Sequence, residues 1–178
     1  MIQTLKNAWK IPELRKKILF VLGCMVVYRF GYSIFVPFVD LDMLATVFEA
    51  YSGTVLGFMN VLVGGGFSQA SIFALSIYPY INASIIMQLL QVAIPALERM
   101  VKEGGEEGRK KLASITRYVT VGLSVIMGYT YYVLLKSSGA LTRTDAWSMI
   151  VIVLTFAAGS AFVMWLGEQM TEKGIGNG

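Results

Sequence analysis

Long apolar runs fill most of the chain, and short charged segments separate them. Four of the runs hold the ~20 residues that a helix needs to cross ~30 Å of hydrocarbon. We place these spans at about 18–37, within 71–96, at 115–135 and at 147–166. The pattern predicts an all-α membrane protein, built as a multi-span helical bundle.

The lysines and arginines predict how the spans are oriented, because loops rich in these residues stay in the cytoplasm. One basic group precedes the first span and another follows the second span, whereas the charged residues between Phe30 and Glu98 are all acidic. We therefore place the amino terminus and the 98–114 loop in the cytoplasm, and 38–52 and 136–146 outside. The first group is Lys6, Lys10, Arg15, Lys16 and Lys17, the second is Arg99, Lys102, Arg109, Lys110, Lys111 and Arg117, and the acidic residues are Asp40, Asp42 and Glu49.

Residues 50–97 carry no formal charge, which is more apolar chain than one crossing uses. With Glu49 outside and Arg99 inside, the segment crosses an odd number of times, and roughly 25 apolar residues are left over after one crossing. These residues must enter the membrane from outside and return, or pack within the protein. We expect a short helix over about 54–63 that the glycines at 64–66 end.

The helix that follows this break has its own signals. Ser68 and Ser71 are candidate caps for it, and Pro79 is a candidate kink. Backbone that leaves the helix at membrane depth is stable only where protein buries it or where it lines a watery cavity. The sequence therefore predicts a half-helix that dips into a cavity, followed by a true span.

Composition excludes several kinds of site. Of the 178 residues 56% are hydrophobic and 15% charged, with a mean hydropathy of +0.64, values outside the soluble range. There is no histidine, so metal sites and catalysis that need one are excluded, and the single Cys24 forms no internal disulfide. No GxxxxGK[ST] motif is present, so we expect no ATPase site. We expect no enzyme activity, cofactor or metal; the carboxylates at Glu106, Glu107, Glu168 and Glu172 lack a supporting motif. No cleavable signal peptide is evident.

Polar residues inside the apolar runs have two interpretations each. Asn82, Ser84, Gln88 and Gln91 either hydrogen bond between helices or form a wall facing water or a substrate. Arg29, the only charge within the first span, either reaches the outer interface or has a functional role. The charged stretch 102–111 is either a solvated loop or a docking surface for a cytoplasmic partner. The small residues at 157–161 favour close helix packing.

Three motifs resemble one known family. SIFALSIYPYINASIIMQLL (71–90) is similar to the second transmembrane segment of the SecY family, the protein-conducting channel of the secretory translocon. Residues 107–118 resemble its second cytoplasmic loop and 164–178 its motif between spans four and five. A shorter, fourth stretch, YRFGYSIFVP, also looks like the end of its first span. Such proteins have ten spans in two inverted halves around a pore. The resemblance implies that 1–178 is the amino-terminal half of such a channel.

The chain departs from the family pattern at Gln69, at Ser76 and in the first-span motif. Bacterial members often carry a basic residue where Gln69 stands and a glycine where Ser76 stands. Their first-span motif continues as Pro-x-Pro-Gly, whereas this chain has only Pro37, with Phe38 in the place of the glycine.

The resemblance also implies roles for particular residues. About 54–69 corresponds to the plug, a short helix that blocks the closed pore, and Ile77 and Ile81 correspond to the apolar pore ring. The second span lines a lateral gate through which signal sequences and spans enter the lipid. The plug core is Leu56, Gly57, Phe58, Met59, Asn60, Val61, Leu62, Val63, Gly64 and Gly65; the gate is Asn82, Ile85, Ile86, Gln88 and Leu89; the partner loop contains Arg109, Lys110 and Lys111.

The expected function is a channel subunit of the protein translocase in the bacterial inner membrane, with a cytoplasmic amino terminus. The implied partners are the carboxy-terminal half of SecY, the subunits SecE and SecG, the SecA motor ATPase or a ribosome, membrane lipid, and signal peptides and nascent chains as substrates. No nucleic acid other than ribosomal RNA is expected. The alternative is half of a secondary transporter, which also uses broken helices.

Overall fold

The computed structural model describes residues 11–176, which form seven helices and no strands. Lys6, Lys10 and Gly178, which belong to predicted segments, lie outside the described residues. In chain order the helices are α2 (Pro12–Tyr32), α3 (Leu41–Ala50), α4 (Val55–Leu62), α5 (Tyr78–Ala93), α6 (Pro95–Glu103), α7 (Gly105–Ser137) and α8 (Ala146–Lys173).

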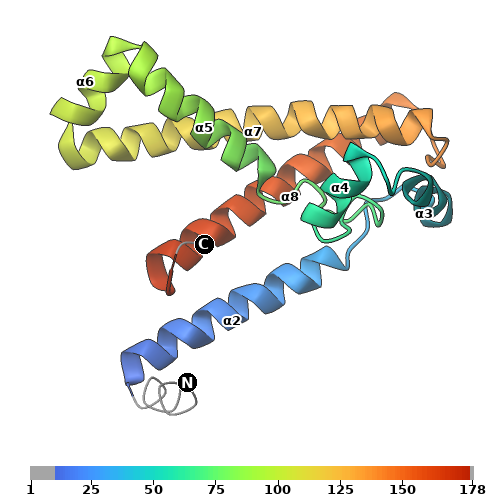
Figure 1. The fold of residues 1–178 in the computed structure, drawn as a ribbon, viewed down its shortest axis with the longest axis horizontal. Coiled ribbons are helices and arrows are strands. Elements are labelled where there is room, and N and C mark those ends of the chain that lie inside the picture. The colour runs from blue at the N-terminus through green and yellow to red at the C-terminus, as the bar shows by residue number, and fades with distance from the viewer. Residues whose placement is uncertain (1–10, 177–178) are drawn as a thin grey trace.

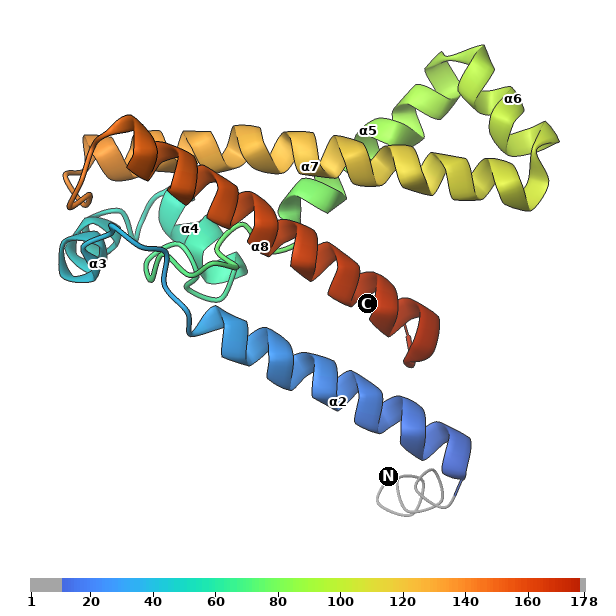
Figure 2. The same ribbon diagram turned by 180° about the vertical axis from the view of Figure 1, so that it is seen from behind.

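Two long helices form the frame. α7 and α8 pack along each other, α5 packs on α7, and α2 packs on α8. Figure 1 shows α3, α4 and the end of α2 gathered where α7 turns into α8, while α6 lies at the opposite end of α7. Seen from behind in Figure 2, α2 and α7 diverge on the two sides of α8.

The first predicted span is helical only as far as Tyr32. Ser33 ends the helix, and the chain then runs extended through Pro37, which has no N–H and disfavours helix in the residue before it. The extended segment finds partners on two sides: the Val36 N–H donates to the Ala70 carbonyl at 2.9 Å, and the Asp40 N–H donates to the Ala140 carbonyl at 2.8 Å. Residues 33–37 therefore belong to a packed connection and not to helix.

By length and composition, two helices among the described residues can cross a membrane, namely α7 and α8. A third crossing is counted if α5 and α6 form one broken span; they are bent by 96° at Ile94. α2 is 21 residues long and mostly apolar, but it also contains Arg15, Lys16, Lys17 and Arg29. It is not among the helices counted above. The map of four spans stays a prediction.

The charged segment at 98–114, predicted as a cytoplasmic loop between spans, forms a helical hairpin of α6 and the start of α7. A turn at Gly104 and Gly105 (φ 51°) joins the two helices. Gly108 permits the hairpin, because a Cβ there would lie 1.8 Å from the Met100 carbonyl oxygen. Glu98 and Lys102 pair at 2.5 Å one turn apart along α6, which supports helix in this polar stretch.

The small residues of α8 do permit close packing, though the nearest backbone is not helical. A Cβ on Gly159 would lie 1.9 Å from the carbonyl oxygen of Ile72, in the connection between α4 and α5. Gly128 of α7 is likewise close to the backbone of α8: a Cβ on Gly128 would lie 3.3 Å from the Val153 carbonyl oxygen. Both glycines thus let main chains approach to contact distance.

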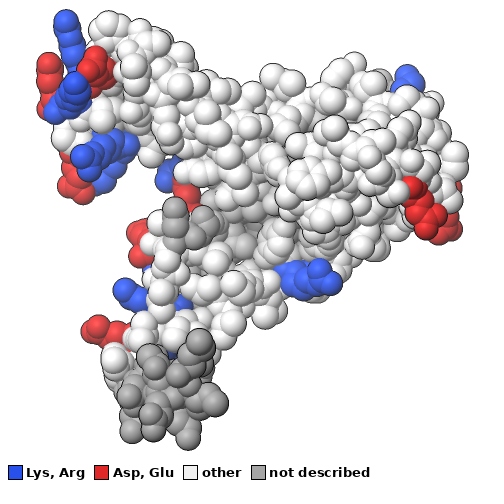
Figure 3. All heavy atoms as spheres, in the orientation of Figure 1, with Lys and Arg blue, Asp and Glu red and all other residues white. Residues whose placement is uncertain are grey.

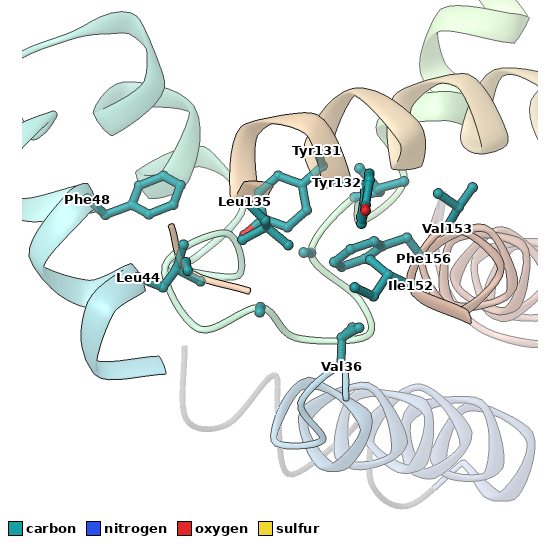
Figure 4. Close-up of a cluster of buried hydrophobic side chains, with 13 residues drawn as sticks. Val36, Leu44, Phe48, Tyr131, Tyr132, Leu135, Ile152, Val153 and Phe156 are labelled. Atoms are coloured by element: carbon teal, nitrogen blue, oxygen red, sulfur yellow. The ribbon is translucent and has the colours of Figure 1, made fainter. Parts of the chain in front are cut away.

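The hydrophobic core lies where α3, α7, α8 and the α4–α5 connection meet. Figure 4 shows Phe48 and Leu44 of α3 facing Leu135 of α7, with Phe156 of α8 beside Tyr131. The Tyr131 and Phe156 rings meet edge to face with centroids 4.9 Å apart, a favoured aromatic geometry. This core fixes one end of the molecule, and the other ends of α2, α7 and α8 extend away from it.

Charged residues form several separate groups on the surface, two of them at opposite ends of α7 (Figure 3). Figure 3 shows mixed Lys, Arg, Asp and Glu around the α6–α7 hairpin, and an acidic group at the opposite end, where Figure 1 places α3. Asp40 caps the amino terminus of α3 by accepting from the N–H groups of Asp42 and Met43, each at 3.1 Å. The apolar middle between these ends is the surface expected of a membrane protein.

Candidate functional site

The candidate site is built on residues 63–77, called the irregular segment here, which run as consecutive turns between α4 and α5. The prediction that Ser68 and Ser71 cap the next helix is wrong, since α5 begins only at Tyr78. Ala70 (φ 44°) and Ser76 (φ 49°) both adopt left-handed conformations, which interrupt a right-handed helix. Pro79 does not kink the helix but starts it, since proline suits the first turn.

Protein groups satisfy the polar backbone of the irregular segment. The Ile72 N–H donates to the Ile34 carbonyl at 3.0 Å, and Ser160 of α8 donates its hydroxyl to the Ser76 carbonyl at 3.2 Å. Ser71 is fully buried, and its Oγ accepts from the Phe73 N–H at 3.2 Å. Of the two environments that the sequence left open for this non-helical backbone, protein or a watery cavity, these contacts show protein.

The short helix predicted over 54–63 is present as α4. Gly57 packs against the turn before it, where a Cβ would lie 2.4 Å from the Tyr51 carbonyl oxygen. Phe58 and Val61 are 63% and 74% exposed, so α4 also shows apolar side chains to its surroundings. Asn60 ties the end of α4 to the irregular segment, because its Oδ1 accepts from the Ser68 N–H at 3.0 Å.

A cavity of about 250 Å³ lies between α4 and α7. Leu56 and Met59 of α4 line one side, and Tyr131 lines the other; the remaining lining residues are Phe48, Phe67, Leu75, Met127, Thr130 and Leu134. The lining is almost wholly apolar. α4 therefore covers this cavity without filling it, a loose contact for so apolar a helix.

α5 has one packed face and one open face. Pro79, Ala83 and Met87, spaced four apart, are buried, and the helix packs chiefly on α7. All five residues assigned to the lateral gate lie on the open side and are exposed: Asn82, Ile85, Ile86, Gln88 and Leu89. The structure thus groups these residues on one surface of α5.

The two isoleucines assigned to the pore ring lie at the first turn of α5. Ile77 is the residue that caps the helix, and its carbonyl accepts from the Ile81 N–H at 3.1 Å. Ile81 is 43% exposed and Ile77 is partly buried. Their side chains therefore follow one another along one side of the helix start, as four-residue spacing predicts.

The polar residues of α5 bear on the choice between hydrogen bonding to other helices and forming a wall that faces water or a substrate. Gln88 Nε2 donates to Ser84 Oγ at 3.3 Å, a bond within α5 and not between helices. Asn82 is exposed on the open face. This arrangement favours the interpretation of a wall over that of helix–helix bonding.

A polar pocket of about 330 Å³ lies beside Ile77. The ion pair at its centre was not predicted from the sequence. Arg117 Nε of α7 donates to Glu168 Oε1 of α8 at 2.8 Å, with Tyr80 also lining the pocket. The opposite charges near the inner ends of the third and fourth predicted spans were the available signal. Glu168 is thus held by an arginine, and no cluster of three metal-ligating side chains occurs in the described part of the chain.

The remaining predicted residues lie apart from this group. Arg109, Lys110 and Lys111 are exposed on the first turns of α7, where Lys110 Nζ lies 3.9 Å from Glu106. Arg29 is exposed in the last turn of α2, with its guanidinium 5.6 Å from the centre of the Tyr32 ring. A cation is stabilised at a helix carboxyl end, which accounts for Arg29 locally.

Comparison with known proteins identifies the family. The SecY family model matches residues 71–178. The chain is 45% identical to the protein translocase subunit SecY of Streptomyces griseus, with 100% of this chain and 43% of that protein aligned. It is 45% identical to the subunit of the same name from Pseudomonas aeruginosa, covering 94% of this chain and 38% of that one. It is 42% identical to the subunit of the same name from Buchnera aphidicola, covering 94% of this chain and 48% of that one.

The chain therefore belongs to the SecY family, as the three motifs predicted, and it spans less than half the length of each of these relatives. Its helical fold is consistent with the amino-terminal half of a SecY protein.

Proposed function

We propose that this chain forms the amino-terminal half of a protein-conducting channel, the translocase subunit that passes unfolded secretory polypeptides across the membrane and releases apolar spans sideways into it. The relatives named above are protein translocase subunits, which supports this function over the alternative of a half transporter. The observation that carries the proposal is the order of α4, the irregular segment and the open face of α5 within a chain that aligns over its whole length with a SecY relative.

The arrangement suits the roles proposed for its parts. α4 is short, apolar and loosely seated over a cavity, as a movable plug has to be. Ile77 and Ile81 stand at the start of α5, and an apolar constriction resists a continuous column of water without binding the passing chain. The exposed face of α5, with Asn82 and Gln88 among aliphatic residues, suits a gate that meets water, protein and lipid.

The proposal includes partners and a location. The channel acts in the bacterial inner membrane with its amino terminus in the cytoplasm. The carboxy-terminal half of the longer protein completes the pore, SecE and SecG accompany it, and SecA or a ribosome supplies the driving force. The α6–α7 hairpin, with Arg109, Lys110 and Lys111 exposed, is the proposed cytoplasmic contact of this half. We expect no enzyme activity in the chain itself.

The test uses the full-length protein with its partner subunits in sealed vesicles. A channel makes a secretory precursor resistant to added protease in the presence of the motor and ATP. A secondary transporter instead accumulates a small solute driven by an ion gradient. Solute accumulation without protection of the precursor would contradict the proposal. Deletion of 56–65 tests the plug separately, since the channel should still fold but leak ions at rest.

A further inference from the structure

The glycines at 64–66 all lie against the side chain of Tyr32, at the end of α2. The Tyr32 hydroxyl donates to the carbonyl of Gly64, and it lies 3.4 Å from the Val63 carbonyl. A Cβ on Gly65 would lie 3.5 Å from the hydroxyl, and one on Gly66 would lie 3.3 Å from Cε2 of the ring. The tyrosine, which is 5% exposed, thus lies against all three glycines.

These glycines provide the points about which α4 can turn. Gly64 and Gly65 have φ values of 68° and 85°, which glycine adopts at little cost and other residues rarely do. α4 has Thr54 and the turn before it on one side and the glycines on the other. Asn60 and Ser68 make local bonds on the glycine side, at 3.0 Å to each other and at 2.9 Å from the Ser68 hydroxyl to the Gly65 carbonyl. The bond from Tyr32 is the one that ties this side to α2.

A second tyrosine holds the chain just beyond the glycines. The hydroxyl of Tyr131, on α7, donates to the Phe67 carbonyl, and the two rings lie 5.2 Å apart. Phe67 leads into the part of the irregular segment that the core and α8 bury. Tyr131 therefore anchors the fixed side of the turn, whereas Tyr32 holds the side that leads to α4.

We infer that Tyr32 is a clasp for α4: its hydroxyl holds the Val63–Gly64 end of the helix in the seated position, and loss of that bond frees α4 to swing about the glycines. The inference rests on the proposed function only in its consequence for conduction. The clasp itself is a statement about where α4 lies, and it names Tyr32 as a positioning residue.

The test compares Tyr32→Phe with Tyr131→Phe in the full-length complex. Each change removes one hydroxyl from a buried ring, so a merely structural loss affects both alike. Spin labels at Val61 and Trp147, both exposed, report the position of α4 against α8 after Cys24→Ser removes the native thiol. Resting conductance in planar bilayers is the second readout.

We expect Tyr32→Phe to raise the population with a displaced α4 about five-fold, the shift that the loss of one buried hydrogen bond produces. Tyr131→Phe should leave that population within two-fold of the parent. An unchanged distance in Tyr32→Phe, or equal shifts in the two variants, would overturn the clasp. A displaced α4 without a rise in conductance supports the clasp and instead contradicts the plug.

Discussion

Arg117 and Glu168 stand 51 positions apart in the chain and join α7 to α8 through a 2.8 Å hydrogen-bonded ion pair. The pair lies in the pocket that Ile77 and Tyr80 also line. Elsewhere the two helices meet through small and apolar residues such as Gly128 and Phe156. The ion pair therefore joins α7 to α8 away from the hydrophobic core. It fixes the two helices relative to each other beside the start of α5.

We expect Arg117→Gln to lower the free energy of unfolding by about 0.5–1 kcal/mol, because the guanidinium is 52% exposed and such pairs are screened by water and salt. The same loss should follow from Glu168→Gln, and the double variant should lose no more than either one. Thermal unfolding of the complex in detergent measures the effect. Arg143→Gln, which breaks the exposed pair with Asp145 within one connection, is the control and should change little. Additive losses in the double variant would show that the two groups act separately.

The lysine and arginine pattern predicts which end of the molecule is cytoplasmic. In a chain carrying Cys24→Ser, single cysteines at Glu49 and Thr142 should react with an impermeant thiol reagent added outside intact cells. Cysteines at Glu106 and Thr171 should react only after the membrane is opened, since the hairpin and the end of α8 are placed in the cytoplasm. Labelling at position 106 from outside would reverse the proposed orientation.

Ser76 tests how much backbone strain the irregular segment contains. Its φ of 49° is costly for a residue with a side chain, and the SecY family often has glycine at this position. Ser76→Gly should raise the free energy of unfolding by up to about 1 kcal/mol, partly offset by the greater freedom of glycine in the unfolded chain. Ser76→Ala keeps the strain and removes only the hydroxyl, so it should not stabilise. Chemical denaturation of the two variants in detergent separates strain from side-chain contacts.

The sequence predicted the parts of the fold that depend on a simple periodic pattern. The uninterrupted apolar runs predicted the cores of α7 and α8, and the glycines correctly predicted the end of α4. The charged stretch at 98–114 was predicted only as a connection between spans, and its helical hairpin, which Gly108 allows to pack closely, was not predicted. A capping signal at Ser71 was outweighed by bonds to distant segments.

The same limit applies to the site. The resemblance to the family, and not spacing, assigned residues to a gate, and the structure groups them on the exposed side of α5. The partners of the irregular segment could not be predicted, since Tyr32, Tyr131 and Ser160 contact it from 31 to 84 positions away. Phe38 (φ 67°) and Ser76 stand where the resemblance implies glycine, and both adopt the left-handed backbone that glycine favours. A glycine expected from the resemblance thus indicated left-handed backbone at both positions.

The pore ring gives the last prediction, through the combined change of Ile77→Ser and Ile81→Ser in the full-length complex. Serine at position 77 still suits the residue that caps α5, so the helix start should persist. Burying an aliphatic side chain is worth roughly 1.5–3 kcal/mol, and water should enter the constriction once two are removed. Because that free energy bears on the closed state alone, resting conductance in planar bilayers should rise at least ten-fold. Precursors with defective signal sequences should also be exported more readily. Ile86→Ser is the matched control, because Ile86 is 40% exposed against 43% for Ile81 and lies on the face assigned to the gate. It should leak far less, and equal resting conductance of the double variant and the parent would remove Ile77 and Ile81 from the pore.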